Sequence, residues 1–300
     1  MEIDLSVNIG KLKLKNPIMV ASGTFDVGAI HELPLLGAIV TKTITLKPRK
    51  GNPMPRTCET AAGMLNAIGL ENPGIDAFIK EKLPKLLKFG APIIVSIASE
   101  GDPEEFAILA KRLDKIKEIA ALELNISCPN LKTKKLISQC PVSTYEVVKS
   151  VRNVTNKTII TKLSPNVTDI TEIAKAAENA GSDAVSLVNT FLGMAIDINQ
   201  RKPKIANITG GLSGPAIKPI ALRMVWETAK AVKIPVIGIG GIMTAQDAIE
   251  FIIAGATAVQ VGTANFVNPS AAVDIIEGLT KYLKENKIEH IKNLIASLRA

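Results

Sequence analysis

IAALELNISCPN, at residues 119–130, is the stretch that says most about how this chain folds. The apolar run at residues 119–124 predicts a buried strand. At its C-terminal tip, residues 125–130 crowd together two amides, a hydroxyl and a thiol next to a proline. Polar residues at the carboxyl end of a core strand are typical of an α/β active site. The thiol of Cys128 has the options of nucleophile, metal ligand or general base.

Short β-rich runs like this one recur along the whole chain. They lie at residues 18–21, 38–43, 93–97, 120–125, 158–163, 184–189, 236–239 and 258–261. Between most of them, apolar residues three and four apart predict helices at residues 75–89, 103–119, 144–154, 167–180, 216–232 and 244–254. Strands alternating with helices over roughly 250 residues predict an α/β fold of the (β/α)8 TIM-barrel type.

We expect one domain over residues 1–300, with two additions to the plain barrel. Residues 5–14 alternate around Gly10-Lys11 and predict an N-terminal β-hairpin. The connections at residues 44–74 and 190–213 are long βα loops, which places them on the catalytic face. A doubly wound sheet is the alternative, but residues 21–24, Ala-Ser-Gly-Thr, are not a dinucleotide fingerprint.

The amino-acid composition argues against a nucleic-acid partner. Aromatic residues make up only 3% of the chain, which argues against a sheet that stacks nucleic-acid bases. The net charge is +8, but the basic clusters at residues 47–50, 132–135 and 201–204 are short and scattered. They are either solvated loops or groups that attract an anionic substrate, cofactor or protein surface. We therefore expect no nucleic-acid partner.

Cysteine and histidine are sparse. The cysteines are Cys58, Cys128 and Cys140, and the histidines are His31 and His290. This set predicts a reducing compartment, no disulfide framework, no metal site and no His-based triad. The N-terminus lacks a signal-peptide pattern and no apolar run approaches 18 residues. We expect a cytoplasmic protein that does not enter a membrane.

Two glycine-containing loops late in the chain predict a phosphate site. Gly240-Gly241 follow the seventh predicted strand, and Gly262-Thr263 follow the eighth. In a TIM barrel these two loops recurrently bind phosphate, because glycine lets backbone N–H groups approach the anion. The alternative is a pair of tight turns without a ligand.

Lysines and amides end several other predicted strands. Lys42 and Lys162 lie in or at the end of core strands, where a charge is costly unless it is matched. They are either an ion pair at the bottom of the barrel or cations for an anion or redox ring at its mouth. Asn189-Thr190 close the sixth strand, and residues 66–70 place a further amide in the long second loop.

In order along the chain, these motifs resemble the dihydroorotate dehydrogenase family. They are residues 21–25 (ASGTF), 41–43 (TKT), 51–56 (GNPMPR), 66–70 (NAIGL), 125–130 (NISCPN), 162–165 (KLSP) and 210–219 (GGLSGPAIKP). The class 1 enzymes of this family use a cysteine base, whereas class 2 enzymes use serine and carry an N-terminal helical extension. Residues 51–53 and 206–215 are more similar to the NAD-linked subclass of class 1.

The resemblance implies an FMN-dependent oxidoreductase. Dihydroorotate becomes orotate in de novo pyrimidine (UMP) biosynthesis: Cys128 removes a proton from C5 while hydride leaves C6 for flavin N5. A free cysteine titrates at about 8.5, which suits base chemistry once nearby donors lower it modestly. The resemblance further implies one FMN per chain. It implies that electrons reach NAD through a partner subunit that holds FAD and a 2Fe-2S cluster, in a heterotetramer built on a homodimer core.

The resemblance also implies roles for individual residues. Lys42 bridges substrate and flavin, Lys162 offsets negative charge on the reduced flavin, and the late glycines hold the phosphate. The substrate site comprises Lys42, Asn66, Ala67, Ile68, Gly69, Leu70, Asn125, Asn189 and Thr190. The FMN site comprises Ser22, Lys42, Thr43, Asn125, Lys162, Val188, Gly214, Gly240, Gly241, Gly262 and Thr263.

Two departures from the family pattern bear on these roles. Residues 131–136 lack the usual Gly-Gly pair of the lid over Cys128. Ser96 stands where the third strand commonly offers FMN an asparagine. Three alternatives stay open: another FMN-dependent pyrimidine oxidoreductase, a fumarate-linked dihydroorotate dehydrogenase without a partner subunit, and a barrel that binds a phosphate ligand or nucleic acid without catalysis.

Overall fold

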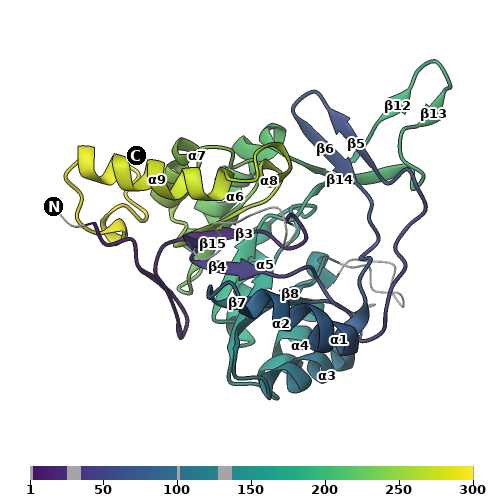
Figure 1. The fold of residues 1–300 in the computed structure, drawn as a ribbon, viewed down its shortest axis with the longest axis horizontal. Helices are drawn as coiled ribbons and strands as arrows, with labels where there is room; N and C mark the ends of the chain where they lie inside the picture. The colour runs from purple at the N-terminus through teal and green to yellow at the C-terminus, as the bar shows by residue number, and fades with distance from the viewer. Residues whose placement is uncertain (1–2, 26–34, 100–101, 128–136, 300) are drawn as a thin grey trace.

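Eight parallel strands close into a barrel at the centre of the molecule (Figure 1). The computed structural model describes residues 3–25, 35–99, 102–127 and 137–299. Each barrel strand pairs with its predecessor in the chain, and the last pairs with the first. The strands are β3 (Ile18–Val20), β4 (Ala38–Val40), β7 (Ile93–Ile97), β8 (Ile119–Asn125), β9 (Thr158–Lys162), β10 (Ala184–Leu187), β15 (Val236–Ile239) and β16 (Ala258–Val261). Closure confirms the predicted TIM barrel and excludes the doubly wound sheet.

Helices form a ring around the barrel, so the strands are buried on both faces. Every residue of β7 and of β9 is buried, as expected for parallel strands covered by helices. The helices are α1 (Gly74–Ala77), α2 (Leu83–Leu87), α3 (Pro103–Asp114), α4 (Pro141–Arg152), α5 (Ile170–Asn179), α6 (Lys218–Ala231), α7 (Ala245–Ala254), α8 (Ala264–Val267) and α9 (Ala271–Glu285). A π-helical turn, Phe78–Lys82, joins α1 to α2.

Local sequence explains where these helices begin and which face they bury. A capping box starts α7: the Thr244 hydroxyl accepts from the Asp247 amide, and the Asp247 carboxylate accepts from the Thr244 amide. In α5 the buried residues Ile170, Ile173, Ala174 and Ala177 recur three and four apart, which gives one apolar stripe against the sheet.

The predicted N-terminal hairpin is present and covers the amino ends of the strands. It consists of β1 (Val7–Ile9) and β2 (Leu12–Leu14), with the turn at Gly10-Lys11. Gly10 has φ +56°, and a Cβ on it would lie 2.7 Å from the Cβ of Asp183, just before β10. Because Asp183 lies at the start of a barrel strand, the hairpin closes the end of the barrel opposite the predicted catalytic face.

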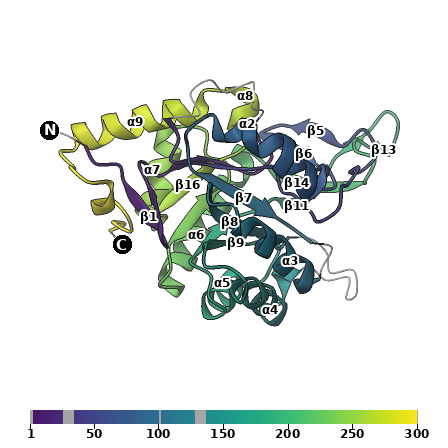
Figure 2. The ribbon, with the colours of Figure 1, turned by 60° about the horizontal axis from the view of Figure 1, so that its bottom comes forward.

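The two long connections fold together into a second sheet, which the sequence analysis did not predict. Its order is β11 (Phe191–Met194), β14 (Thr209–Ser213), β6 (Gly63–Asn66) and β5 (Thr57–Thr60), all antiparallel. Beyond it lie β12 (Ile196–Asp197) and β13 (Lys202–Pro203). Figures 1 and 2 show these strands projecting from the barrel on the side away from the two chain termini.

Two further details differ from the sequence-based expectation. The helix predicted over residues 103–119 ends at Asp114, because β8 already begins at Ile119. The C-terminal helices α8 and α9 follow the eighth strand and were not predicted; α9 packs against α7 and β3. Within the described residues, no helix is both long and apolar enough to cross a membrane.

Candidate active site

A cavity of about 830 Å³ lies at the carboxyl ends of the barrel strands, beneath the second sheet. Its lining draws on residues that follow almost every barrel strand and on β6, β11 and β14. All the predicted site residues that the structure describes line it: Ser22, Lys42, Thr43, Asn66, Ala67, Ile68, Gly69, Leu70, Asn125, Lys162, Val188, Asn189, Thr190, Gly214, Gly240, Gly241, Gly262 and Thr263. The fold therefore brings the two predicted sites into one cavity.

Cys128, the predicted base, and the predicted lid at residues 131–136 lie outside the described residues. Ser127, the residue before Cys128, does line the cavity. The side-chain amide of Asn189 donates to the Ser127 hydroxyl at 2.8 Å and to the Asn125 side-chain oxygen at 3.5 Å. These bonds tie the end of β8 to the end of β10 and so fix the backbone that leads into Cys128.

The loop after β6 presents backbone to the cavity because Asn52 holds it from behind. The Asn52 side chain donates to the Ala67 carbonyl at 2.9 Å, and the Asn52 amide donates to the Ile68 carbonyl at 3.0 Å. Gly69 has φ +75°, and a Cβ on it would lie 2.7 Å from the Asn52 side chain. Only glycine suits that conformation at that approach. The sequence analysis quoted Asn52 within a motif but gave it no role.

Lys42 reaches into the cavity beside Gly23. A Cβ on Gly23 would lie 2.9 Å from Cδ of Lys42, so the glycine makes room for the lysine side chain. Desolvation by the surrounding protein lowers the pKa of Lys42. Glu71 opposes this shift, whereas the positive charges of Arg56 and Lys162 reinforce it. An anion in the cavity would offset the same cost, because it favours the protonated lysine.

Lys162 combines the two roles that the sequence left open. Its ammonium lines the cavity, and it also pairs with a carboxylate inside the barrel, at 3.7 Å from Oε1 of Glu123. Glu123 lies in β8 and is fully buried. The sequence analysis counted it within an apolar run and missed it. The signal was available, since glutamate is almost never fully buried without a charged or hydrogen-bonded partner.

Ser96 does not line the cavity but supports a residue that does. Its hydroxyl is fully buried and lies 2.9 Å from the Thr43 hydroxyl, and Asn125 donates to that same threonine oxygen at 3.4 Å. The chain thus keeps a polar group behind Thr43 where the family commonly has an asparagine. The hydroxyl pair fixes the Thr43 side chain at the cavity wall.

The glycine loops have the properties of a phosphate cradle. Within the described residues, the backbone amides of Gly240, Gly241, Gly262 and Thr263 donate to no backbone or side-chain acceptor. Gly241 has φ +73°, and a Cβ on it would lie 2.8 Å from the Cβ of Lys218. At Gly262 a Cβ would meet only ordinary contacts, 3.6 Å or more away. The fold therefore does not require glycine at position 262, whereas a ligand seated against its backbone would. Free amides around this space fit a phosphate group.

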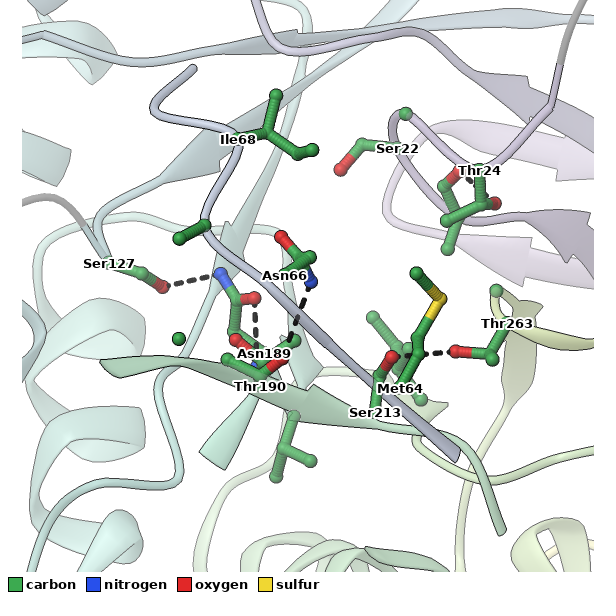
Figure 3. Close-up of a pocket in the computed structure, with 18 of the residues that line it drawn as sticks. Ser22, Thr24, Met64, Asn66, Ile68, Ser127, Asn189, Thr190, Ser213 and Thr263 are labelled. Atoms are coloured by element: carbon green, nitrogen blue, oxygen red, sulfur yellow. Dashed lines mark hydrogen bonds between the residues drawn. The ribbon is translucent and has the colours of Figure 1, made fainter. Parts of the chain in front are cut away.

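Figure 3 shows that the cavity has two distinct ends. Ser127 and Asn189 lie at one end, beside the backbone that leads to Cys128. Ser213 and Thr263 lie at the other, where the Thr263 hydroxyl donates to that of Ser213 at 2.8 Å. A long ligand with a phosphate tail fits this arrangement, with its ring system toward the amides.

Several lining residues were given no individual role by the sequence analysis: Thr24, Arg49, Met64, Asn166, Asn207, Ser213, Met243 and Phe266. Most of them lie in the second sheet or in loops whose positions depend on contacts between distant segments. Among the described residues, no group of three or more histidine, cysteine, aspartate or glutamate side chains is placed to hold a metal ion.

Comparisons with known proteins agree with this geometry. The family model for dihydroorotate dehydrogenase matches residues 4–283. The dihydroorotate dehydrogenase B (NAD(+)) catalytic subunit of Geotalea uraniireducens (strain Rf4) is 57% identical over 300 residues, which cover 98% of each chain. The corresponding subunit of Trichlorobacter lovleyi is 58% identical over 303 residues, which cover 99% of each chain.

A solved structure shows the shared fold. The crystal structure of DHODH from Eimeria tenella in complex with ferulenol superposes with a TM-score of 0.81. It covers 98% of this chain and 88% of that one, at 24% identity. The match over residues 4–283 and the full-length identity above 50% show that this chain belongs to the dihydroorotate dehydrogenase family.

Proposed function

We propose that this chain oxidises dihydroorotate to orotate with one bound FMN, as a step of pyrimidine biosynthesis. One observation carries the proposal: a single cavity joins a cradle of free backbone amides to two lysines and to a cluster of amide side chains beside Ser127, the residue before Cys128 in the sequence. The names of the relatives support it, since each is a catalytic subunit of dihydroorotate dehydrogenase B.

Different parts of the cavity bind the FMN phosphate, the flavin ring and the substrate. The amides of residues 240–241 and 262–263 hold the FMN phosphate, and Ser22, Thr43, Val188 and Gly214 line the flavin. FMN, when bound, supplies an acceptor for hydride. The carboxylate and the ring of dihydroorotate bind the ammonium of Lys42, the side chains of Asn66, Asn125, Asn189 and Thr190, and the backbone of residues 67–70.

Cys128 takes the proton from C5 of the substrate as the hydride leaves C6. Ser127 and Asn189 are hydrogen-bonded to each other, which fixes the backbone just before Cys128 in the sequence. The second sheet covers the cavity, and excluding water there strengthens each ion pair and hydrogen bond around the substrate. Lys162 places positive charge where the two electrons arrive.

A comparison of two substrates tests this assignment. The chain is reconstituted with FMN, and orotate formation is followed with a redox dye as electron acceptor. We expect turnover with dihydroorotate and little with dihydrouracil, which lacks the carboxylate that Lys42 binds. Equal turnover of the two would favour another pyrimidine oxidoreductase. A chain that takes up no FMN would refute the proposal.

We further propose that the electrons reach NAD through a partner subunit carrying FAD and a 2Fe-2S cluster. The support is the wording of the relatives' names, which combine NAD(+) with a catalytic subunit. The expected assembly is a heterotetramer on a homodimer of this chain. Dihydroorotate should yield NADH only after the partner subunit is added. Efficient reduction of fumarate by this chain alone would instead identify a fumarate-linked enzyme.

We propose a cytoplasmic location on chemical grounds. Cys58 forms no disulfide within the described residues, and the chain has only three cysteines, which suits a reducing compartment. Fractionation of the native host, with the chain followed by antibody, tests this location.

A further inference from the structure

The buried carboxylate of Glu123 is only half satisfied by hydrogen bonds. Its Oε2 accepts from the Gln260 side chain at 2.6 Å and from the Ser186 hydroxyl at 3.2 Å. Its Oε1 is buried and accepts no hydrogen bond from any described residue. The positive charge that faces this oxygen is the ammonium of Lys162, 3.7 Å away, which is too far for a hydrogen bond. A buried carboxylate oxygen left this way is costly, which calls for an explanation.

The ammonium of Lys162 is also buried with few hydrogen-bond partners. Its side chain is only 7% exposed, and its one hydrogen bond within the described residues is a long one, 3.4 Å to the Ser22 hydroxyl. A buried lysine without a counter-ion loses its proton readily, because burial disfavours the charged form. Within the described residues, the Glu123 carboxylate is the one anionic group that pairs with this ammonium.

Among the described residues of the surrounding strands, no other group supplies a negative charge to pair with Lys162. Lys42 is the second titratable group that faces it, and its positive charge repels the ammonium. The neighbouring strand β10 (AVSL) and the strands β16 (AVQV), β3 (IMV), β7 (IIVSI) and β15 (VIGI) carry only neutral side chains. On β8, Glu123 is the single titratable residue.

We propose that Glu123 is a positioning residue that keeps Lys162 protonated and held at the cavity wall before the substrate's electrons arrive. The inference rests on the proposed function, since it assigns Lys162 to the flavin. When the cofactor is oxidised, the carboxylate is the counter-ion of Lys162. A negative charge on the reduced cofactor would then be offset by Lys162, so Lys162 itself would not have to take up a proton.

The proposal fixes how many protons accompany the electrons. In an electrochemical reduction, the oxidised cofactor takes two electrons and one proton from solution and becomes an anion. With Lys162 already charged, the total uptake is one proton. If Lys162 is neutral beforehand, it takes a second proton when that anion forms. The slope of the midpoint potential against pH reports this number, because each proton contributes equally to it.

The test is the slope in the FMN-loaded wild type and in Glu123→Gln. The glutamine oxygen can still accept from Gln260 and Ser186, so the network that packs the barrel persists while the charge is lost. We expect one proton per two electrons in the wild type around neutral pH. In Glu123→Gln, we expect the slope to double, because Lys162 without its counter-ion takes up a second proton when the anion forms. Glu123→Asp retains the charge and should keep the wild-type slope.

Glu178→Gln is the matched control for net charge. Glu178 lies in the last turn of α5, near the amino end of β15, where its carboxylate accepts from the amides of Lys233 and Ile234. Removing that charge should leave the slope unchanged. An unchanged slope in Glu123→Gln would overturn the positioning role. A second proton taken up by the wild type, and also by Lys42→Met, would overturn it without the need for a Glu123 variant. A wild type that binds no FMN, or that dihydroorotate does not reduce, would instead refute the proposed function.

Discussion

At the scale of single residues, the chemistry depends on charges that the fold keeps partly out of water. Lys42 and Lys162 both line the cavity, but their electrostatic surroundings differ. Lys42 is desolvated and near two other positive charges, so its pKa is lowered. Lys162 has a buried carboxylate beside it. Lys42 is thus the lysine whose charge depends most on the arrival of an anion, and this difference can be measured.

The binding of orotate should depend on pH through Lys42. The charged lysine binds the carboxylate, so affinity is complete below the pKa of the free protein and falls as the pH rises through it. Because that pKa is lowered, the loss begins below the ordinary value of 10.5. Lys42→Met should weaken orotate binding at neutral pH by about 1.5–3 kcal/mol, and it should remove this part of the pH dependence.

Isothermal titration of both proteins over the alkaline range checks the Lys42 prediction. Titration of orotate itself is common to the two, so the difference between them isolates the lysine. Lys11→Met, at an exposed position in the turn of the hairpin, serves as the control for removing a positive charge. Parallel curves for wild type and Lys42→Met would contradict the role of Lys42.

Cys128 can be tested by replacing the thiol with a hydroxyl, a much weaker base. Cys128→Ser should leave the affinity for FMN unchanged and slow reduction of the flavin by about 10²–10⁴-fold, the usual contribution of a general base. Rapid mixing with dihydroorotate under anaerobic conditions measures the rate. Reduction at the wild-type rate would show that another group removes the proton.

At the scale of elements, the loops after β15 and β16 separate what the fold needs from what the ligand needs. Gly241 is required by the fold, since its φ is +73° and Lys218 is close. Gly262 is not, because its φ is ordinary and the protein leaves space for a methyl group. The two glycines belong to the same predicted cradle, so they make an informative pair.

Gly262→Ala should therefore uncouple folding from cofactor binding. Without FMN, its thermal stability should be unchanged or raised by up to about 1 kcal/mol, because alanine restricts the unfolded chain. Its affinity for FMN should fall at least tenfold, about 1.4 kcal/mol. Thermal melts and FMN titration of Gly262→Ala and Gly241→Ala check this, with Gly241→Ala expected to lose stability as well. Unaltered FMN binding in Gly262→Ala would place the phosphate elsewhere.

The elements that the sequence predicts correctly are those whose signal is local. The eight barrel strands follow from β-rich runs, and their closure follows from their number. The second sheet could not be found this way, because it pairs Asn66 with Gly211, far apart in the chain. Short strands rich in glycine have little propensity of their own. Helix α9 is different, since Ile275, Leu279 and Leu283 recur four apart and carried a usable signal.

The same limit applies to the site. Motifs placed Lys42, Asn66 and the glycine loops in one cavity because parallel strands all end at the same edge. Glu123 was missed because a single charged residue in an apolar run does not show which residue carries the opposite charge. That depends on the lateral pairing of β8 with β9, where Glu123 lies opposite Ile160 and Asn125 opposite Lys162.

At the scale of the whole molecule, the two ends of the barrel have different tasks. The N-terminal hairpin closes the amino end, and Ile9 in it is fully buried. The cavity lies at the carboxyl end, beneath the second sheet. In TIM barrels the first end serves stability and the second serves chemistry. Changes at the hairpin should therefore affect folding without affecting the site.

Ile9→Ala should test this division. It removes buried methyl and methylene groups, so the free energy of unfolding should fall by about 2–5 kcal/mol. The affinities for FMN and orotate, measured well below the melting temperature, should stay at the wild-type values. Ile9→Val, a smaller deletion, should cost about 0.5–1.5 kcal/mol. A loss of orotate affinity in Ile9→Ala that exceeds its unfolded fraction would show that the two ends are coupled.

The most direct test of the account is an anaerobic titration of the FMN-loaded chain with dihydroorotate. The account predicts that one equivalent per chain removes the yellow absorbance of the oxidised flavin and yields one orotate. A flavin that stays oxidised in excess dihydroorotate, or a chain that cannot be loaded with FMN, would contradict the claim that this cavity joins a flavin to that substrate.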